Sequence, residues 1–236
     1  MKLSFTVPLL AAAFLVGLEF WTSVPSPRVL AQPAGGGEAK AASKRFEVDT
    51  TASHVYVRVD PDGRGHAHGV VGQLASGSVA LGASQMAGEL AFDLTSFTAD
   101  APEVRKYVGV EAKMSDSDRR SVTRTMLGSQ VLNTRQYPKA TYSITSVTPL
   151  DGQAAGLPGR YRFEGRLSLH GAEQPLRFEA KAEASGTEGS LQMRGQFSLK
   201  QTDYKMKPYS ALYGALQVKD QLTIHGDLLL HVKGSK

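Results

Sequence analysis

Hydrophobic and polar residues alternate with a period of two over much of the chain. The clearest stretch, residues 161–169, reads YRFEGRLSL, and related stretches occupy residues 191–199 and 222–230, with a shorter one at residues 86–94. Because successive side chains of a strand point to opposite faces, this pattern predicts strands with one buried and one solvated face. The chain is therefore expected to be built mainly from antiparallel strands.

A glycine stands among the apolar positions of each of these four stretches. Glycine weakens a strand and leaves no side chain to pack, so it marks either a tight bend of the sheet or room for something else. A curled sheet closed around a hollow interior accounts for both readings. We therefore predict an all-β fold, an antiparallel barrel of about eight strands with one short helix in a long connection, and the interior glycines are Gly88, Gly165, Gly195 and Gly226.

The period-two pattern stops between residues 99 and 138. Ser115, followed by Asp118, is typical of a helix start, and Val122 and Met126 are spaced for one helix face. These residues predict a helix of about three turns, and since connections lie at the ends of a barrel, we expect it over one mouth. Its arginines are interpreted either as a solvated basic face or as a clamp for a charged head group, and they are Arg119, Arg120 and Arg124.

The structures of two further segments can be predicted from their sequence. Phe46 and Val48, a polar turn at residues 49–53 and the alternating valines of residues 55–59 together predict an opening hairpin. Residues 200–217 are irregular and rich in tyrosine, which predicts a long excursion at the barrel rim. Long ordered loops of this kind are usually functional.

The first residues have the pattern of an export signal. Lys2 precedes an apolar run, and small residues before Gln32 would suit cleavage near Ala31. We expect residues 1–31 to be a secretory signal peptide, residues 32–44 a flexible linker and residues 45–234 the barrel. The protein is then periplasmic or secreted, and an uncleaved membrane anchor is the alternative.

Composition narrows the classes of function. The chain of 236 residues has no cysteine, so it can form no disulfide and has no thiolate for catalysis or metal binding. Its net charge is only +5. No basic run is interleaved with aromatic residues, which argues against nucleic acid as a partner. The small excess of charge leaves room for weak contact with an anionic membrane surface.

Catalytic and cofactor motifs are missing from the sequence. It contains no nucleophile elbow, no HExxH and no phosphate-binding glycine loop, so we predict neither an enzyme nor a cofactor. His66 and His68 share a strand face at a spacing that metals use, but no third ligand accompanies them. We therefore expect no metal, and one of the two histidines in a polar pocket with the other on the wall or rim.

The inward register of the predicted strands is apolar and largely aromatic. Such a wall repels water and selects long or flat apolar molecules, although the same side chains could instead pack into an ordinary filled core. The residues expected to line the interior are Val57, Phe92, Tyr142, Phe163, Phe178, Met193, Phe197 and Ile224.

Several segments resemble the YceI-like family, which consists of periplasmic, lipocalin-like barrels associated with polyisoprenoid binding. The similar segments are FEVDTTASHVYV at residues 46–57, QYPKATYSITSV at residues 136–147 and GRYRFEGRLSLHGAEQPL at residues 159–176. His66 or His68 resembles the early-strand histidine of the family, whereas Met126 stands where a histidine is expected.

The resemblance implies a non-enzymatic protein that holds a polyisoprenoid or quinone-type lipid in the barrel. A structural or stress-related barrel with a filled core, and a periplasmic metal-binding protein, are the alternatives. The sequence does not indicate an oligomeric state.

Overall fold

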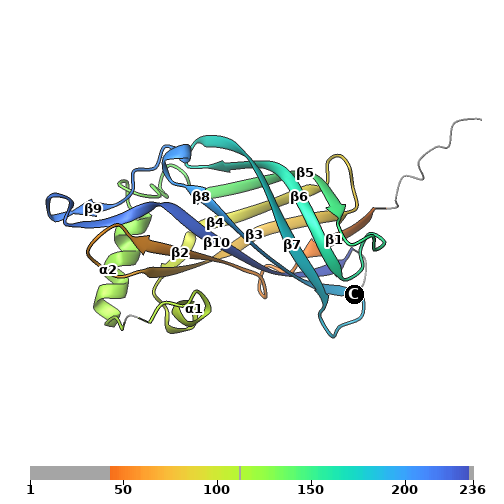
Figure 1. Ribbon diagram of the computed structural model, residues 1–236, viewed down its shortest axis with the longest axis horizontal. Coiled ribbons are helices and arrows are strands. Elements are labelled where there is room, and N and C mark those ends of the chain that lie inside the picture. Colours follow the sequence, from red (N-terminus) through yellow and green to blue (C-terminus); the bar gives the residue numbers. More distant parts are fainter. Residues whose placement is uncertain (1–42, 112, 234–236) are drawn as a thin grey trace, which may run out of the picture. The chain divides into compact units, whose positions relative to one another are not determined.

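The computed structural model describes residues 43–111 and 113–233, and the predicted leader and most of the predicted linker lie outside them. Within these residues eight strands, β2 to β8 and β10, close into an antiparallel barrel (Figure 1). The predicted all-β barrel is confirmed. The strands are β1 (Lys44–Val48), β2 (His54–Pro61), β3 (His68–Leu81), β4 (Gly88–Ala99), β5 (Lys139–Pro149), β6 (Gly159–Leu169), β7 (Ala172–Ala184), β8 (Ser190–Lys200), β9 (Ser210–Ala211) and β10 (Leu216–Val232).

The last strand, β10, closes the barrel. It pairs with β8 along one edge and with β2 and then β1 along the other, so that Ile224 lies between Phe197 and Val57. It begins at Leu216, six residues before the alternating stretch at residues 222–230. Its early start carries it beyond the barrel to meet β9.

The predicted hairpin between the first two strands is wrong. Both β1 and β2 lie between β3 and β10 and follow one another along the wall, rather than pairing with each other. The turn between them is held by Leu229 of β10, whose carbonyl accepts from the Asp49 amide at 2.9 Å and whose amide donates to Ser53 Oγ at 2.9 Å. The polar residues 49–53 therefore make a kink that lets one edge of the wall follow the curve of the barrel.

A two-residue turn joins β6 and β7 in a hairpin. Leu169 pairs with Ala172, and the two residues between them, His170 and Gly171, have φ values of 51° and 71°. Consecutive positive φ values are typical of the two-residue turns whose twist matches that of antiparallel strands. The glycine supplies the second of these conformations without strain.

The predicted helix is α2 (Asp116–Leu127). The Ser115 hydroxyl oxygen accepts from the Asp118 amide at 3.2 Å and donates to the Asp118 carboxylate at 2.7 Å, which is the expected capping arrangement. The helix lies beside the end of β4, where Thr123 Oγ1 accepts from the Ala99 amide at 3.0 Å. It therefore forms part of the wall at the end where β9 also lies (Figure 1).

A shorter helix, α1 (Pro102–Tyr107), was not predicted, because six residues are too few to show a period. It packs outside the barrel, where the Tyr107 ring stacks on Tyr56 with their centroids 3.9 Å apart. Two short 3-10 turns, η1 (Thr202–Tyr204) and η2 (Leu212–Gly214), lie in the long β8–β10 connection. Among the described residues, no helix has both the length and the apolar character needed to cross a membrane.

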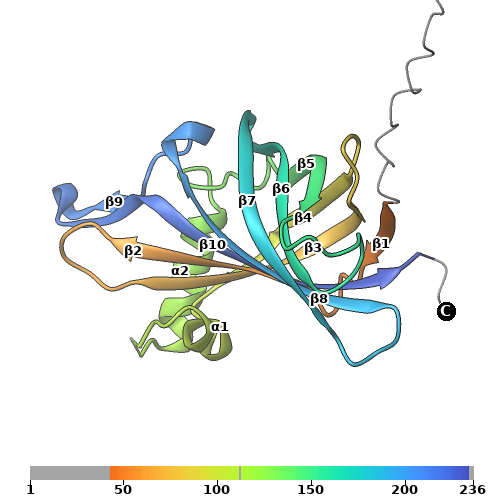
Figure 2. The same cartoon turned by 45° about the vertical axis from the view of Figure 1, so that its right-hand side comes forward.

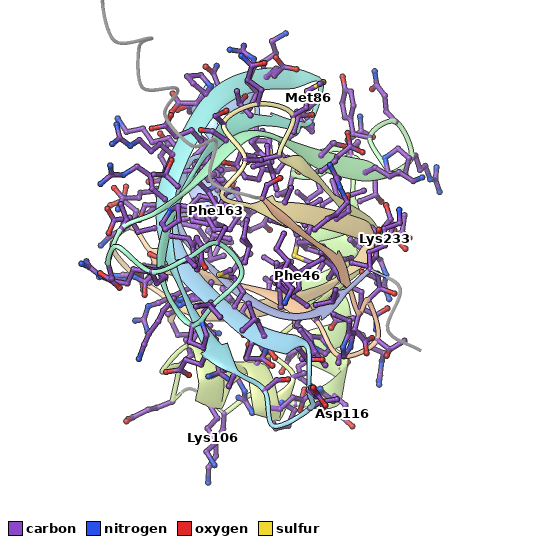
Figure 3. All side chains as sticks on the ribbon, turned by 90° about the vertical axis from the view of Figure 1, so that its right-hand side faces the viewer. Phe46, Met86, Lys106, Asp116, Phe163 and Lys233 are labelled. Carbon is purple, nitrogen blue, oxygen red and sulfur yellow. The ribbon has the colours of Figure 1, made fainter. Side chains whose placement is uncertain are left out.

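The interior of the barrel holds two hydrophobic clusters. One surrounds Phe46 and Phe163, which are 1% and 3% exposed and lie inside the ring of strands in Figure 3. The other, around Val57, Phe97 and Ile224, lies toward α2 and includes Val122 and Met126 of that helix. The barrel therefore has a packed half and a half that α2 helps to close.

Candidate ligand-binding site

An apolar cavity, which we call the outer cavity, lies under α2 and has a volume of about 300 Å³. Its wall comes from β2, β3, β4, β6, β8 and β10, from one face of α2 with the segment that follows it, and from the β8–β10 connection. Most of the wall is aliphatic or aromatic. The polar residues that line it are His68, Ser121, Thr125, Gln201 and Tyr209.

The cavity exists because the strands separate toward this end. Hydrogen-bonded pairing between β7 and β8 ends at Ala180 and Gly195, beyond which the two strands diverge (Figure 2). Pairing of β4 with β5 likewise ends at Asp93, and α2 takes the place of a neighbouring strand beside the remainder of β4. A barrel that opens in two places is wider there than eight paired strands would be.

A second, inner cavity of about 70 Å³ lies deeper in the barrel. Aromatic rings occupy much of the space around it. The Phe178 ring lies 5.2 Å from that of Phe163, 5.0 Å from that of Phe197 and 5.7 Å from that of Tyr142, measured between centroids. The filled core that the sequence left open as an alternative therefore describes this part of the barrel better than an open tunnel does.

Tyr142 is the polar group of the inner wall. Its hydroxyl donates to the carbonyl oxygen of Leu176 at 3.2 Å, so the buried phenol has a partner. Burial raises the pKa of Tyr142 far above its usual value, and the Glu164 carboxylate adds to the effect. The phenol therefore stays neutral, and the inner wall carries no charge there.

The two cavities adjoin along β8 and β10. Leu199 pairs with Leu222 at the wall of the outer cavity, and Phe197 pairs with Ile224 at the wall of the inner one. Each pair is two residues along from the other on the same face of the sheet, which is a separation of about 7 Å. A chain-like apolar molecule in the outer cavity would thus point its end at the aromatic cluster.

His68 is the polar group best placed to meet a ligand. It lines the outer cavity, and its Nδ1 lies 2.6 Å from the Oδ2 of Asp100. Asp100 is 1% exposed and also accepts from the Gly69 amide at 2.9 Å, so its carboxylate is held firmly. A proton on Nδ1 satisfies the carboxylate and leaves Nε2 as the nitrogen that can bond to another group.

The structure distributes the predicted interior residues unevenly. Val57 and His68 line the outer cavity, while His66 is exposed and lies beside His68 with the ring centroids 4.6 Å apart. The inner cavity is lined by all the others, which are Phe92, Tyr142, Phe163, Phe178, Met193, Phe197 and Ile224.

Sequence reasoning missed most of the outer wall. Val122 and Met126 were assigned to a helix expected over one mouth, but they were not predicted to line the ligand space. Met206 and Tyr209 come from the irregular connection, where no register exists to predict an inward direction. The signals available were the i, i+4 pair on the helix and the length of the connection.

Of the four glycines, Gly195 and Gly226 border the inner cavity, and a Cβ on Gly226 would meet no atom within 4 Å. Gly165 and Gly88 do not line either cavity. A Cβ on Gly165 would lie 2.2 Å from the Ser143 carbonyl oxygen, and one on Gly88 would lie 2.0 Å from that of Ser78. The expectation of room at these two positions is corrected: they allow close approach of neighbouring strands, which is the tight-bend role of glycine.

The arginines of α2 do not line the cavity. Arg119 pairs with Asp116 at 2.6 Å, which lowers the pKa of that carboxyl, while Arg120 and Arg124 are exposed. Of the two interpretations of this basic face, the structure favours the solvated one. Among residues 43–111 and 113–233, no three histidine or acidic side chains gather as metal ligands would.

Comparison with known proteins identifies the family. The sequence model of the YceI-like domain family matches residues 46–230. The chain belongs to the YceI-like family. No curated protein matches it.

Two solved structures show the same fold. BcnA of Burkholderia cenocepacia is 14% identical, with a TM-score of 0.51 over 77% of this chain and 98% of that one. A polyisoprenoid binding domain from Saccharophagus degradans, implicated in plant cell wall breakdown, is 15% identical, with a TM-score of 0.52 over 79% of this chain and 98% of that one. At sequence identities this low, the similarity to these two structures shows only that the fold is shared.

Proposed function

We propose that this YceI-like protein is a non-enzymatic carrier that holds an isoprenoid-type or quinone-type lipid in the outer cavity. The observation that carries the proposal is the apolar space of about 300 Å³ between α2 and the strands. That volume is at the lower end of the range of small-molecule sites. The polyisoprenoid binding domain named above shares the fold and supports the same class of ligand.

The chemistry of the wall supports an apolar chain. A space lined mostly by hydrocarbon gives water few partners and is filled favourably by an apolar molecule. Removing apolar surface from water contributes about 25 cal/mol per Å² to the free energy of binding. A few isoprene units therefore gain enough free energy to exceed the entropic cost of ordering the bound chain. The aromatic cluster at Phe178 sets the depth to which the chain can enter.

His68 gives the ligand an orientation. With Asp100 behind it, the imidazole offers one nitrogen to an oxygen of a head group or of a quinone ring. The aliphatic chain then lies between α2 and β10, with its polar end beside the start of β3. The predicted leader supports an exported carrier, periplasmic or secreted.

A matched pair of variants tests the cavity. Leu199 lines it, while Ser198, its neighbour on β8, is exposed. In Leu199→Trp the indole fills part of the space, and we expect at least about a tenfold loss of affinity for a fluorescent farnesyl or geranylgeranyl probe. Ser198→Trp adds the same ring outside and should bind like the unmodified protein. Equal affinity in both variants, with both folded, would exclude the outer cavity as the site.

A further inference from the structure

The β9–β10 hairpin, residues 209–218, lies at the same end of the barrel as α2 (Figures 1 and 2). Apolar side chains at its tip are exposed to solvent. Tyr213 is fully exposed, and Leu212 and Leu216 are 69% and 39% exposed. Large apolar side chains that gather at one exposed point are typical of interaction sites. The rest of the described surface offers no comparable run of neighbouring residues, since its other large exposed hydrophobic side chains are Met86, Tyr107 and Leu157.

The tip of this hairpin has a conformation that these residues rarely adopt. Leu212, Tyr213 and Gly214 have successive φ values of 51°, 56° and 89°, and the Ala215 amide donates to the Leu212 carbonyl oxygen at 3.1 Å. Positive φ is unfavourable for bulky side chains and persists where surrounding structure holds it, often at functional sites. Leucine and tyrosine thus occupy a turn in which glycine or asparagine would be less strained.

The stem that carries the tip is firmly attached. The Val218 amide donates to the Tyr209 carbonyl oxygen at 3.1 Å, and the Asp62 amide of the β2–β3 turn donates to that of Gln217 at 2.9 Å. Tyr209 and Val218 also line the outer cavity. The exposed tip and the ligand space are therefore parts of one continuous element.

The lysines around the hairpin favour contact with an anionic surface. Residues 204–219 contain three lysines, Lys205, Lys207 and Lys219, and no acidic residue. All three are exposed, and in the part of the chain that the structure describes none of them forms an ion pair. Acidic residues flank this segment at Asp203 and Asp220, and Asp62 of the β2–β3 turn bonds to the hairpin through its amide. Asp60, near the end of β2, pairs with Arg58.

We propose that this hairpin docks the barrel on an anionic lipid bilayer, with Leu212, Tyr213 and Leu216 entering the interface and the lysines meeting the head groups. Tyrosine is enriched at membrane interfaces, and apolar insertion with basic neighbours is the usual composition of a peripheral anchor. The inference rests on the proposed function, because docking at this end places the outer cavity beside the bilayer from which a lipid would be taken.

Fluorescence provides a direct test. The barrel closes its own sheet and core, so residues 32–236 can be used alone, and they contain no tryptophan because Trp21 is the single one of the chain. Tyr213→Trp should show a blue-shifted emission, quenched by brominated lipid, on vesicles of phosphatidylcholine with a minority of phosphatidylglycerol. Met86→Trp is the matched control, since Met86 is 84% exposed and belongs to the β3–β4 turn, which lies at the end away from β9 (Figure 1). Its emission should not change.

Co-sedimentation with the same vesicles tests the energetics. Leu212→Ser with Tyr213→Ser should lower binding at least about tenfold, and each lysine changed to glutamine should lower it about fivefold. Both sets of variants should still bind the prenyl probe in solution, which separates this inference from the proposed function. The inference is overturned by an unshifted Tyr213→Trp emission, by equal shifts at both tryptophans, or by hairpin variants that alter self-association or binding to a protein while leaving vesicle binding unchanged.

Discussion

Asp100 and His68 form a hydrogen-bonded pair at the wall of the outer cavity, with 2.6 Å between the carboxylate Oδ2 and the imidazole Nδ1. Asp100 adopts a φ of 59°, and its amide donates to the Gly69 carbonyl oxygen at 2.6 Å. Residues other than glycine seldom take such a φ, so the backbone is held in an unfavourable conformation that places the carboxylate behind the imidazole. The pair therefore fixes the direction of the one histidine that reaches the ligand space.

Removal of the imidazole should destabilise the protein. His68→Ala leaves a buried Asp100 carboxylate with fewer partners, and the expected loss is about 2 kcal/mol in the free energy of unfolding. Chemical denaturation measures it. The matched control is His66→Ala, which removes an exposed ring and should change stability by less than about 0.5 kcal/mol. Similar losses in the two variants would show that the Asp100 contact contributes nothing particular.

The interior glycines should respond in opposite ways to alanine. In Gly165→Ala the new methyl group meets the Ser143 carbonyl oxygen, and we expect a destabilisation of about 3 kcal/mol or more. In Gly226→Ala the methyl group enters open space and should be neutral or slightly stabilising, within about 0.5 kcal/mol. Thermal unfolding of the two proteins checks the contrast, and equal effects would contradict the assigned roles.

Acid should weaken the kink between β1 and β2. Hydrogen bonds from Thr51 and Ala52 lower the pKa of Asp49 to about 2. A carboxyl group whose pKa is lower in the folded state contributes stability above its unfolded pKa and loses it as the pH falls toward the folded value, here between about pH 4 and pH 2. Because the side chain is partly exposed, we expect about 1 kcal/mol. Urea titrations at the two pH values measure the free energy of unfolding, and Asp49→Asn should lose less of it on acidification than the unmodified protein does.

The cap of α2 should control access to the outer cavity. Ser115→Ala removes the hydroxyl that bonds to Asp118 in both directions, and the expected cost is about 1 kcal/mol of helix stability. Hydrogen exchange of the α2 amides should accelerate, and the prenyl probe should dissociate faster. Ser117→Ala, on the exposed surface of the same helix, serves as the control and should leave both rates unchanged.

The sequence predicted those parts of the fold that depend on local pattern. The alternation of residues 161–169 and 222–230 gave strands and their inward faces, and Ser115 gave the start of α2 within one residue. It failed where partners are distant in the chain. Nothing in residues 46–59 indicates that Leu229 will bond to both sides of the turn and align β1 with β2 along the wall.

The site was predicted only in part for the same reason. Period two separates inward from outward residues, so Phe178 and Ile224 were placed inside, but it does not say whether inward rings fill the space between them. That depends on where β7 and β8 separate, which involves the whole barrel. Asp100, the partner of His68, lies in the stretch where alternation stops and so carried no signal at all.

Native mass spectrometry of the protein, purified without detergent, tests most directly whether the outer cavity holds a lipid. A barrel with an apolar space under α2 should retain a lipid, visible as added mass that organic extraction removes, and Leu199→Trp should carry much less of it than Ser198→Trp. A mass equal to that of the bare chain in all three proteins, with no uptake of added prenyl lipid, would contradict the account.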